Sequence, residues 1–151
     1  MHTLAAHTRW TYTTRVRCAQ SDIDLGMHTG TASCEIGSGG GLTLSERGVW
    51  QSTTPGLPAP GTKATNRWRA TPREKPGSRW RIEHLRLGTP VHLLDLEPAG
   101  PGRWASVTPH PCAEDTYELD ADTTDPDRPT LVWTVRGPAK AHLLTTVYRP
   151  G

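Results

Sequence analysis

The chain has 151 residues, of which 34% are hydrophobic, and its formal net charge is +2. This length fits one domain with a core of its own, and so small a charge gives no indication of a nucleic-acid or membrane partner. Glycine and proline contribute 15 and 14 residues, so turns are expected to be frequent.

The first ten residues, MHTLAAHTRW, contain no apolar segment of the kind found in signal peptides, and no apolar run in the chain is long enough for a membrane helix. The three cysteines, Cys18, Cys34 and Cys112, form no Cys-x-x-Cys pair. An odd number of unpaired thiols predicts a reduced, cytoplasmic protein. We expect residues 1–7 to be a flexible tail and residues 8–151 to form the single domain.

Short segments with alternating polar and apolar side chains follow one another along the whole chain. Strands are predicted, in chain order, over residues 9–18, 26–36, 42–52, 62–70, 79–87, 90–98, 103–108, 115–122, 130–136 and 141–149. Loops are predicted over residues 37–41, 54–61, 71–78 and 124–129, where Gly, Pro and Asp accumulate. No window shows sustained helical spacing. The fold class is therefore all-β, and a meandering antiparallel barrel is preferred because closure removes exposed edges.

Alternation also predicts which side chains face the interior. In the segment 79–87, Trp80, Ile82 and His84 share one face and the charged residues share the other. A histidine on an apolar face has a cost unless it has a polar partner, and a ligand could be that partner. A barrel of about eight strands is wide enough to hold one small ligand.

The stretch SVTPHPCAEDTYELDAD (106–122) concentrates reactive side chains. A metal site would use His110 and Cys112, with His92, His84 or Asp115 completing it, although no second Cys/His pair has metal-ligand spacing. A thiolate nucleophile at Cys112 activated by His110 is a second possibility. We favour a structural corner, in which the Pro residues end one strand and Tyr117 re-enters the sheet with its ring inward.

Two other stretches have a functional and a structural interpretation. In VRGPAK, Lys140 could hold an anionic or carbonyl group at the barrel rim, but a hairpin turn with Gly137 at positive φ is favoured. In RWRATPREKPGSRWRIEHLR (67–86), Arg alternates with Trp, which can indicate nucleic-acid binding. Period two sends the Trp and Arg side chains to opposite faces, so no nucleic-acid partner is predicted.

The second half of the chain resembles an uncharacterised bacterial lipocalin-like family known only as a domain of unknown function. The resemblance rests on TPVHLLDL, HPCAEDTYE and WTVRGPAKAHLLTTVYR, and it extends over most of the chain from about residue 10. The residues that match are His92, His110, Cys112, Asp115, Tyr117, Trp133, Gly137, Pro138, Lys140 and Tyr148. The family resemblance implies a single antiparallel, lipocalin-like (calycin-type) β-barrel of about 8–10 strands with a central pocket. The chain departs from the family pattern at Ala139, at Ala141-His142 and at His84.

At fold level the chain is also similar to small lipocalin-like barrels that act as cyclases in actinomycete biosynthetic pathways. This predicts a cofactor-independent cyclase or isomerase of a polyketide-like substrate, folded inside the pocket. The alternative is a non-catalytic binding protein for an apolar small molecule. The candidate catalytic residues are His84, His92, Tyr117, Tyr12 and Glu46, with Glu46 as a possible base. The candidate substrate-binding residues are Trp10, Trp50, Trp68, Trp80, Trp133, Lys140 and Tyr148. No metal and no cofactor are predicted, and the protein is expected to be a monomer or a homodimer without a membrane partner.

Overall fold

The structure is a computed structural model and describes residues 1–73 and 78–151. These residues form one short 3-10 helix and eleven strands. The elements are η1 (His2–Ala5), β1 (Arg9–Cys18), β2 (Asp24–Ile36), β3 (Leu42–Gln51), β4 (Lys63–Arg73), β5 (Arg79–Arg86), β6 (Thr89–Gly100), β7 (Arg103–Ser106), β8 (His110–Cys112), β9 (Asp115–Asp122), β10 (Thr130–Gly137) and β11 (Lys140–Pro150). No helix in the described ranges is long and apolar enough to cross a membrane.

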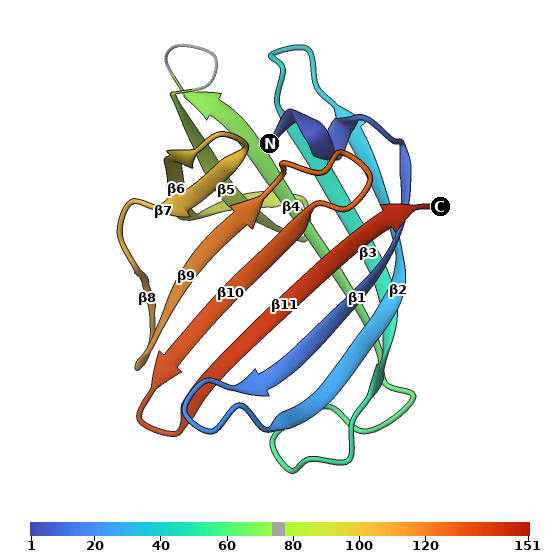
Figure 1. Ribbon diagram of the computed structural model, residues 1–151, viewed down its shortest axis with the longest axis vertical. Coiled ribbons are helices and arrows are strands. Elements are labelled where there is room, and N and C mark those ends of the chain that lie inside the picture. Colours follow the sequence, from blue (N-terminus) through green and yellow to red (C-terminus); the bar gives the residue numbers. More distant parts are fainter. Residues whose placement is uncertain (74–77) are drawn as a thin grey trace.

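The strands close into an antiparallel barrel (Figure 1). The order is β10-β11-β1-β2-β3-β4-β5-β6-β7-β9-β8, and the pairing of β9 with β10 completes the ring. The short strand β8 pairs with the first residues of β9, and β7 pairs with its last residues. Ten strands therefore form the barrel wall, and β8 is an addition at its margin. The predicted all-β fold with a single antiparallel barrel is confirmed.

Most predicted strands coincide with observed ones to within a few residues, and the first matches β1 over Arg9–Cys18. The strand β8 falls in the predicted corner between two strands. The loop predicted over residues 71–78 begins late, because β4 continues to Arg73. Residues 74–77 of that loop lie outside the described residues.

The apolar core fills the half of the barrel that lies nearest η1. Inward side chains from nearly all strands meet there, including Trp10, Leu44, Trp80, Ile82 and Leu119. The sequence predicts a flexible tail over residues 1–7. In the structure this segment contributes to the core, and η1 closes one end of the barrel (Figure 1). Met1 and Leu4 are buried, and Trp10 Nε1 donates to the Leu4 carbonyl at 3.1 Å.

Two irregularities decide which residues face the interior. The register between β5 and β6 shifts after Ile82, so that Leu93 is an extra residue on β6. Such a bulge reverses the alternation of the bulged strand relative to its partner. His92 then lies opposite Glu83, on the outer face, although Leu94 and Leu96 are buried inside.

The second irregularity is a close approach of β2 and β3. Gly30 and Gly48 lie opposite each other, and a Cβ at Gly30 would collide with the backbone of Arg47 and Gly48. At Gly48 an added Cβ would lie 2.6 Å from Tyr12 Oη and 2.8 Å from His28 Nε2. The missing side chain of Gly30 allows the close approach of the two strands, and that of Gly48 makes room for the rings of Tyr12 and His28 against the sheet.

Candidate functional site

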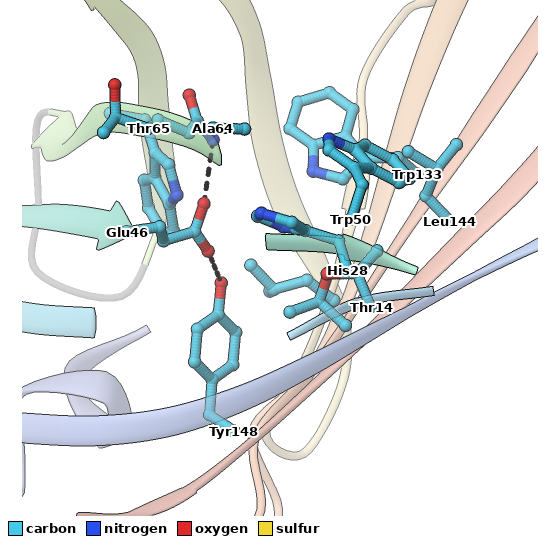
Figure 2. A pocket seen from close by; sticks show the side chains of 13 residues that line it. Thr14, His28, Glu46, Trp50, Ala64, Thr65, Trp133, Leu144 and Tyr148 are labelled. Atoms are coloured by element: carbon cyan, nitrogen blue, oxygen red, sulfur yellow. Dashed lines mark hydrogen bonds between the residues drawn. The ribbon is translucent and has the colours of Figure 1, made fainter. Parts of the chain in front are cut away.

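The half of the barrel away from η1 contains a cavity of about 200 Å³. Its walls come from β1, β2, β3, β4, β10 and β11, and the apolar core borders it through Trp68, Leu131 and Tyr148 (Figure 2). The lining residues are Thr14, His28, Glu46, Trp50, Ala64, Thr65, Asn66, Trp68, Leu131, Trp133, Leu144, Thr146 and Tyr148. β5 pairs with β4 only from Trp68 onward, so Ala64 and Asn66 belong to a stretch that precedes this pairing.

Glu46 is the central acidic group of the cavity. The Tyr148 hydroxyl donates to its Oε1, and Asn66 Nδ2 donates to its Oε2 at 2.9 Å (Figure 2). Burial raises the pKa of Glu46, and these two hydrogen bonds offset only part of the rise. Burial, with Glu46 nearby, also raises the pKa of Tyr148, so the phenol keeps its proton. The Glu46 carboxyl therefore stays protonated to a higher pH than an exposed carboxyl does.

His28 is the second titratable group of the cavity. Its Nδ1 lies 3.2 Å from the Tyr12 hydroxyl, and its ring stacks on Trp50 with centroids 5.1 Å apart. Burial lowers the pKa of His28, and the nearby Gly48 backbone partly offsets this. Burial, followed by the charge of Glu46, raises the pKa of Tyr12. His28 is therefore neutral and Tyr12 protonated at physiological pH.

The remaining walls are mostly apolar or aromatic. Three of the five predicted tryptophans, Trp50, Trp68 and Trp133, line the cavity. Trp10 and Trp80 instead belong to the closed core, where both are almost fully buried. Thr14 and Thr146 lie opposite each other on β1 and β11, and their hydroxyls share a hydrogen bond of 2.8 Å. The two hydroxyls of this pair are thus hydrogen-bonded to each other.

Three predicted catalytic residues lie away from the cavity lining. His92 is on the outer face, 44% exposed, and its Nε2 lies 3.3 Å from Asp95. His84 shares the side of Trp68, but it lines a larger open hollow of about 1180 Å³ and accepts a hydrogen bond from Arg86. Tyr117 is half-buried on β9, opposite Val135. Tyr12 and Glu46 are the predicted catalytic residues that the fold does bring to the cavity.

Lys140 also lies elsewhere. Its Nζ is 2.7 Å from Asp115 Oδ2, at the end of the two-residue hairpin between β10 and β11. The expected positive φ at Gly137 is wrong, since Gly137 is not among the residues in that region. An added Cβ at Gly137 would collide with the Asp115 carboxylate, so the glycine leaves room for the ion pair. The GPxK and DxY stretches therefore meet in a structural corner.

His110 and Cys112 belong to the same corner, on β8 opposite Tyr117 and Asp115. Cys112 is exposed and is not among the residues that line the cavity. In the ranges 1–73 and 78–151 no three His, Cys, Asp or Glu side chains gather in a way that would hold a metal ion. The favoured structural corner is consistent with these positions.

The sequence did not single out His28, Thr14, Thr146, Asn66 or Leu144 as site residues. His28 lies in GMHTGTASCEI, a weakly patterned strand rich in Thr and small residues. The spacing could have indicated it, because His28 is an even number of residues from Ala32 and Cys34, so that all three side chains fall on the same face of the strand. Ala32 and Cys34 are buried in the structure. The weak apolar pattern hid it, because small residues do not reveal which face of a strand is covered.

Comparison with solved structures supports the fold. The chain superposes with a TM-score of 0.64 on the structure of the S-type phycobiliprotein lyase CPES from Guillardia theta, at 8% sequence identity. The alignment covers 99% of this chain and 90% of that one. At this identity the likeness concerns the fold alone. No curated protein matches the sequence. Residues 6–150 match the family of unknown function DUF6314, and the chain belongs to that family.

Proposed function

We propose that this protein binds a small, largely apolar molecule in the barrel cavity and isomerises or cyclises it without a cofactor. The observation that carries the proposal is the Glu46 carboxyl, held in an aromatic cavity by hydrogen bonds from Tyr148 and Asn66. Its raised pKa brings it nearer to neutral pH, where a carboxyl is most effective in proton transfer. Glu46 would take a proton from one carbon of the substrate and return it to another.

The cavity volume limits the size of the substrate. An engineered cavity of about 150 Å³ in another protein binds benzene, and pockets for drug-sized ligands occupy about 300–1,000 Å³. The cavity of about 200 Å³ therefore suits a single-ring molecule, or one end of a longer polyketide-like chain. The rest of such a chain would extend out of the cavity.

The walls supply the other contribution to catalysis. Trp50, Trp133 and Leu144 would hold a flexible substrate in a compact conformation and exclude water from the reacting atoms. The structural neighbour named above is a lyase, which supports the idea that this kind of barrel can carry an enzyme activity. Because only the fold is shared, none of its chemistry is assigned to this chain.

The same walls also favour a second candidate, a binding protein that holds an apolar molecule without changing it. Trp50, Trp68 and Trp133 would retain such a ligand by burial alone, and no step by Glu46 would be needed. The two candidates share the site and differ only in turnover.

The experiment compares consumption with stoichiometry. Single-ring and polyketide-like precursors are incubated with the protein, and the products are followed by mass spectrometry. We expect turnover far beyond one equivalent, and Glu46→Gln to slow it by about 100-fold or more, because a positioned proton-transfer group contributes about that much. Glu118→Gln is the matched control, since Glu118 pairs with Arg136 instead of lining the cavity. Binding without turnover would leave the binding protein, and no binding at all would overturn both candidates.

A further inference from the structure

The barrel wall is incomplete beside the first residues of β4. β3 pairs with β4 from Lys63 onward, but β5 pairs with it only from Trp68, which lies opposite His84. In the part of the chain that the structure describes, no strand pairs with the other edge of β4 over residues 63–67. The ring of paired strands therefore ends early on this side of the cavity.

The cavity and the larger hollow adjoin each other along this edge. Ala64, Thr65 and Asn66 are consecutive and all line the cavity, although neighbouring residues of a strand face opposite sides of the sheet. The cavity thus reaches the edge of β4 and not only its inner face. Glu46, Thr65 and Asn66 also line the hollow of about 1180 Å³. The hollow is the space next to the cavity into which a longer ligand would extend.

The hollow carries positive charge that the protein does not neutralise. Four arginines line it, namely Arg9, Arg47, Arg67 and Arg86. Among the described residues, seven other Arg or Lys side chains pair with carboxylates, and none of those seven lines the hollow. None of the four arginines forms such an ion pair with a described residue. The carboxyl groups of the lining are Glu35 and Glu46, so four positive charges face at most two negative ones.

Two of these arginines lie where β4 and β5 separate. Arg67 is exposed and directly precedes Trp68, where the pairing with β5 begins. Arg86 is the last residue of β5, and its side chain falls on the same side of the sheet as His84. Its Nε donates to His84 Nδ1 at 3.3 Å, which leaves its other N–H groups for a ligand. The two guanidinium groups therefore belong to the two strands that border the incomplete part of the wall.

From this arrangement we infer that the ligand of the cavity is an amphiphilic anion. Its apolar end occupies the cavity, and a chain passes the edge of β4 and carries a carboxylate or a phosphate to Arg67 and Arg86. The inference rests on the proposed function, because it assumes that a small molecule occupies the cavity. Guanidinium groups bind carboxylates and phosphates through paired, charge-assisted hydrogen bonds. The cavity of about 200 Å³ holds a single ring, and the hollow has room for the rest.

The test uses three probes with a terminal phenyl ring on the same hexyl chain: phenylhexanoate, phenylhexyl phosphate and the neutral phenylhexanol. Dissociation constants are measured by calorimetry for the wild type, Arg67→Gln, Arg86→Gln and the double variant. In the wild type we expect the better of the two anions to bind about tenfold more tightly than phenylhexanol, and this anion identifies the favoured group. Each single variant should weaken anion binding by about fivefold and the double variant by about tenfold or more, since exposed charge pairs are individually weak. Phenylhexanol should bind equally to all four proteins.

Arg128→Gln is the matched control, because Arg128 is exposed and lines neither the cavity nor the hollow. A measurement on the wild type keeps the test decisive if a variant fails to fold. Added NaCl should weaken binding of the anions and should not weaken binding of phenylhexanol. Hexanoate, which lacks the ring, should bind far more weakly than phenylhexanoate, because the two ends of the ligand act together.

Three results would overturn the inference: anions that bind no more tightly than phenylhexanol, an equal loss in Arg128→Gln, or hexanoate that binds as tightly as phenylhexanoate. If phenylhexanol binds but the anions gain nothing, the anion selection fails while small-molecule binding in the cavity stands. If the protein takes up neither these probes nor any single-ring precursor, both proposals fail.

Discussion

Replacing Gly48 by alanine tests the geometry on which the cavity depends. The added Cβ would lie 2.6 Å from Tyr12 Oη and 2.8 Å from His28 Nε2, and closer still to the carbonyl oxygen of Thr29. Thr29 cannot retreat freely, because it is paired with Thr13 on one side and Val49 on the other. Inserting a methyl group into a packed region costs about 1–3 kcal/mol, and a backbone neighbour places this case at the upper end. We therefore expect Gly48→Ala to lower the free energy of unfolding by about 3 kcal/mol.

Urea unfolding followed by tryptophan fluorescence measures this loss. With a urea dependence of about 2 kcal/mol/M, the midpoint should fall by about 1.5 M. Gly39→Ala is the matched control, since no atom lies within 4 Å of the position of its Cβ. Its midpoint should stay close to that of the wild type. If Gly48→Ala unfolds at the wild-type midpoint, the close approach of β2, β3 and Tyr12 described above is wrong.

Three further predictions concern Glu46, Leu4 and His92. The pKa of Glu46 is raised above its ordinary 4.5, so its contribution to stability is fully present below that pH and is lost as pH rises through the folded-state pKa. The stability of the wild type relative to Glu46→Gln should thus decrease as the pH rises above about 4.5 in urea titrations, and a constant difference would contradict the shift. Leu4→Ala should lower the free energy of unfolding by about 3 kcal/mol, because Leu4 is fully buried; a freely moving N-terminal segment would show no loss. His92→Ala should leave ligand binding and turnover unchanged, and reduced binding in calorimetry would mean that the bulge does not turn His92 outward.

Much of the barrel wall could be predicted from the sequence because strand alternation is a local property. In β1 the side chains of Trp10 and Tyr12 must fall on the face opposite Arg9 and Thr11, whatever the rest of the chain does. The same reasoning placed Trp133 on the face that lines the cavity. Turn residues then separated the strands, and a meander of this kind closes most simply as a barrel.

The site was predicted only in part, because alternation gives the face of a strand but not the depth along the barrel. Trp80 and Trp50 both face inward, yet Trp80 lies in the closed core and Trp50 at the cavity. Depth depends on the register between neighbouring strands, which no single strand encodes. Likewise, Lys140 forms an ion pair with Asp115 because the β10–β11 hairpin lies beside the start of β9, and the spacing within one strand does not predict this contact.

The sequence by itself determined the strands, their two faces and the closed all-β architecture, since these follow from the spacing of side chains within each segment. Only the tertiary structure decided that η1 closes one end, that Leu93 turns His92 outward, and that His28 meets Tyr12. Each of these depends on a bulge, a glycine contact or a terminal segment packing on distant strands. Such features arise from non-local contacts, and a pattern of period two carries no record of them.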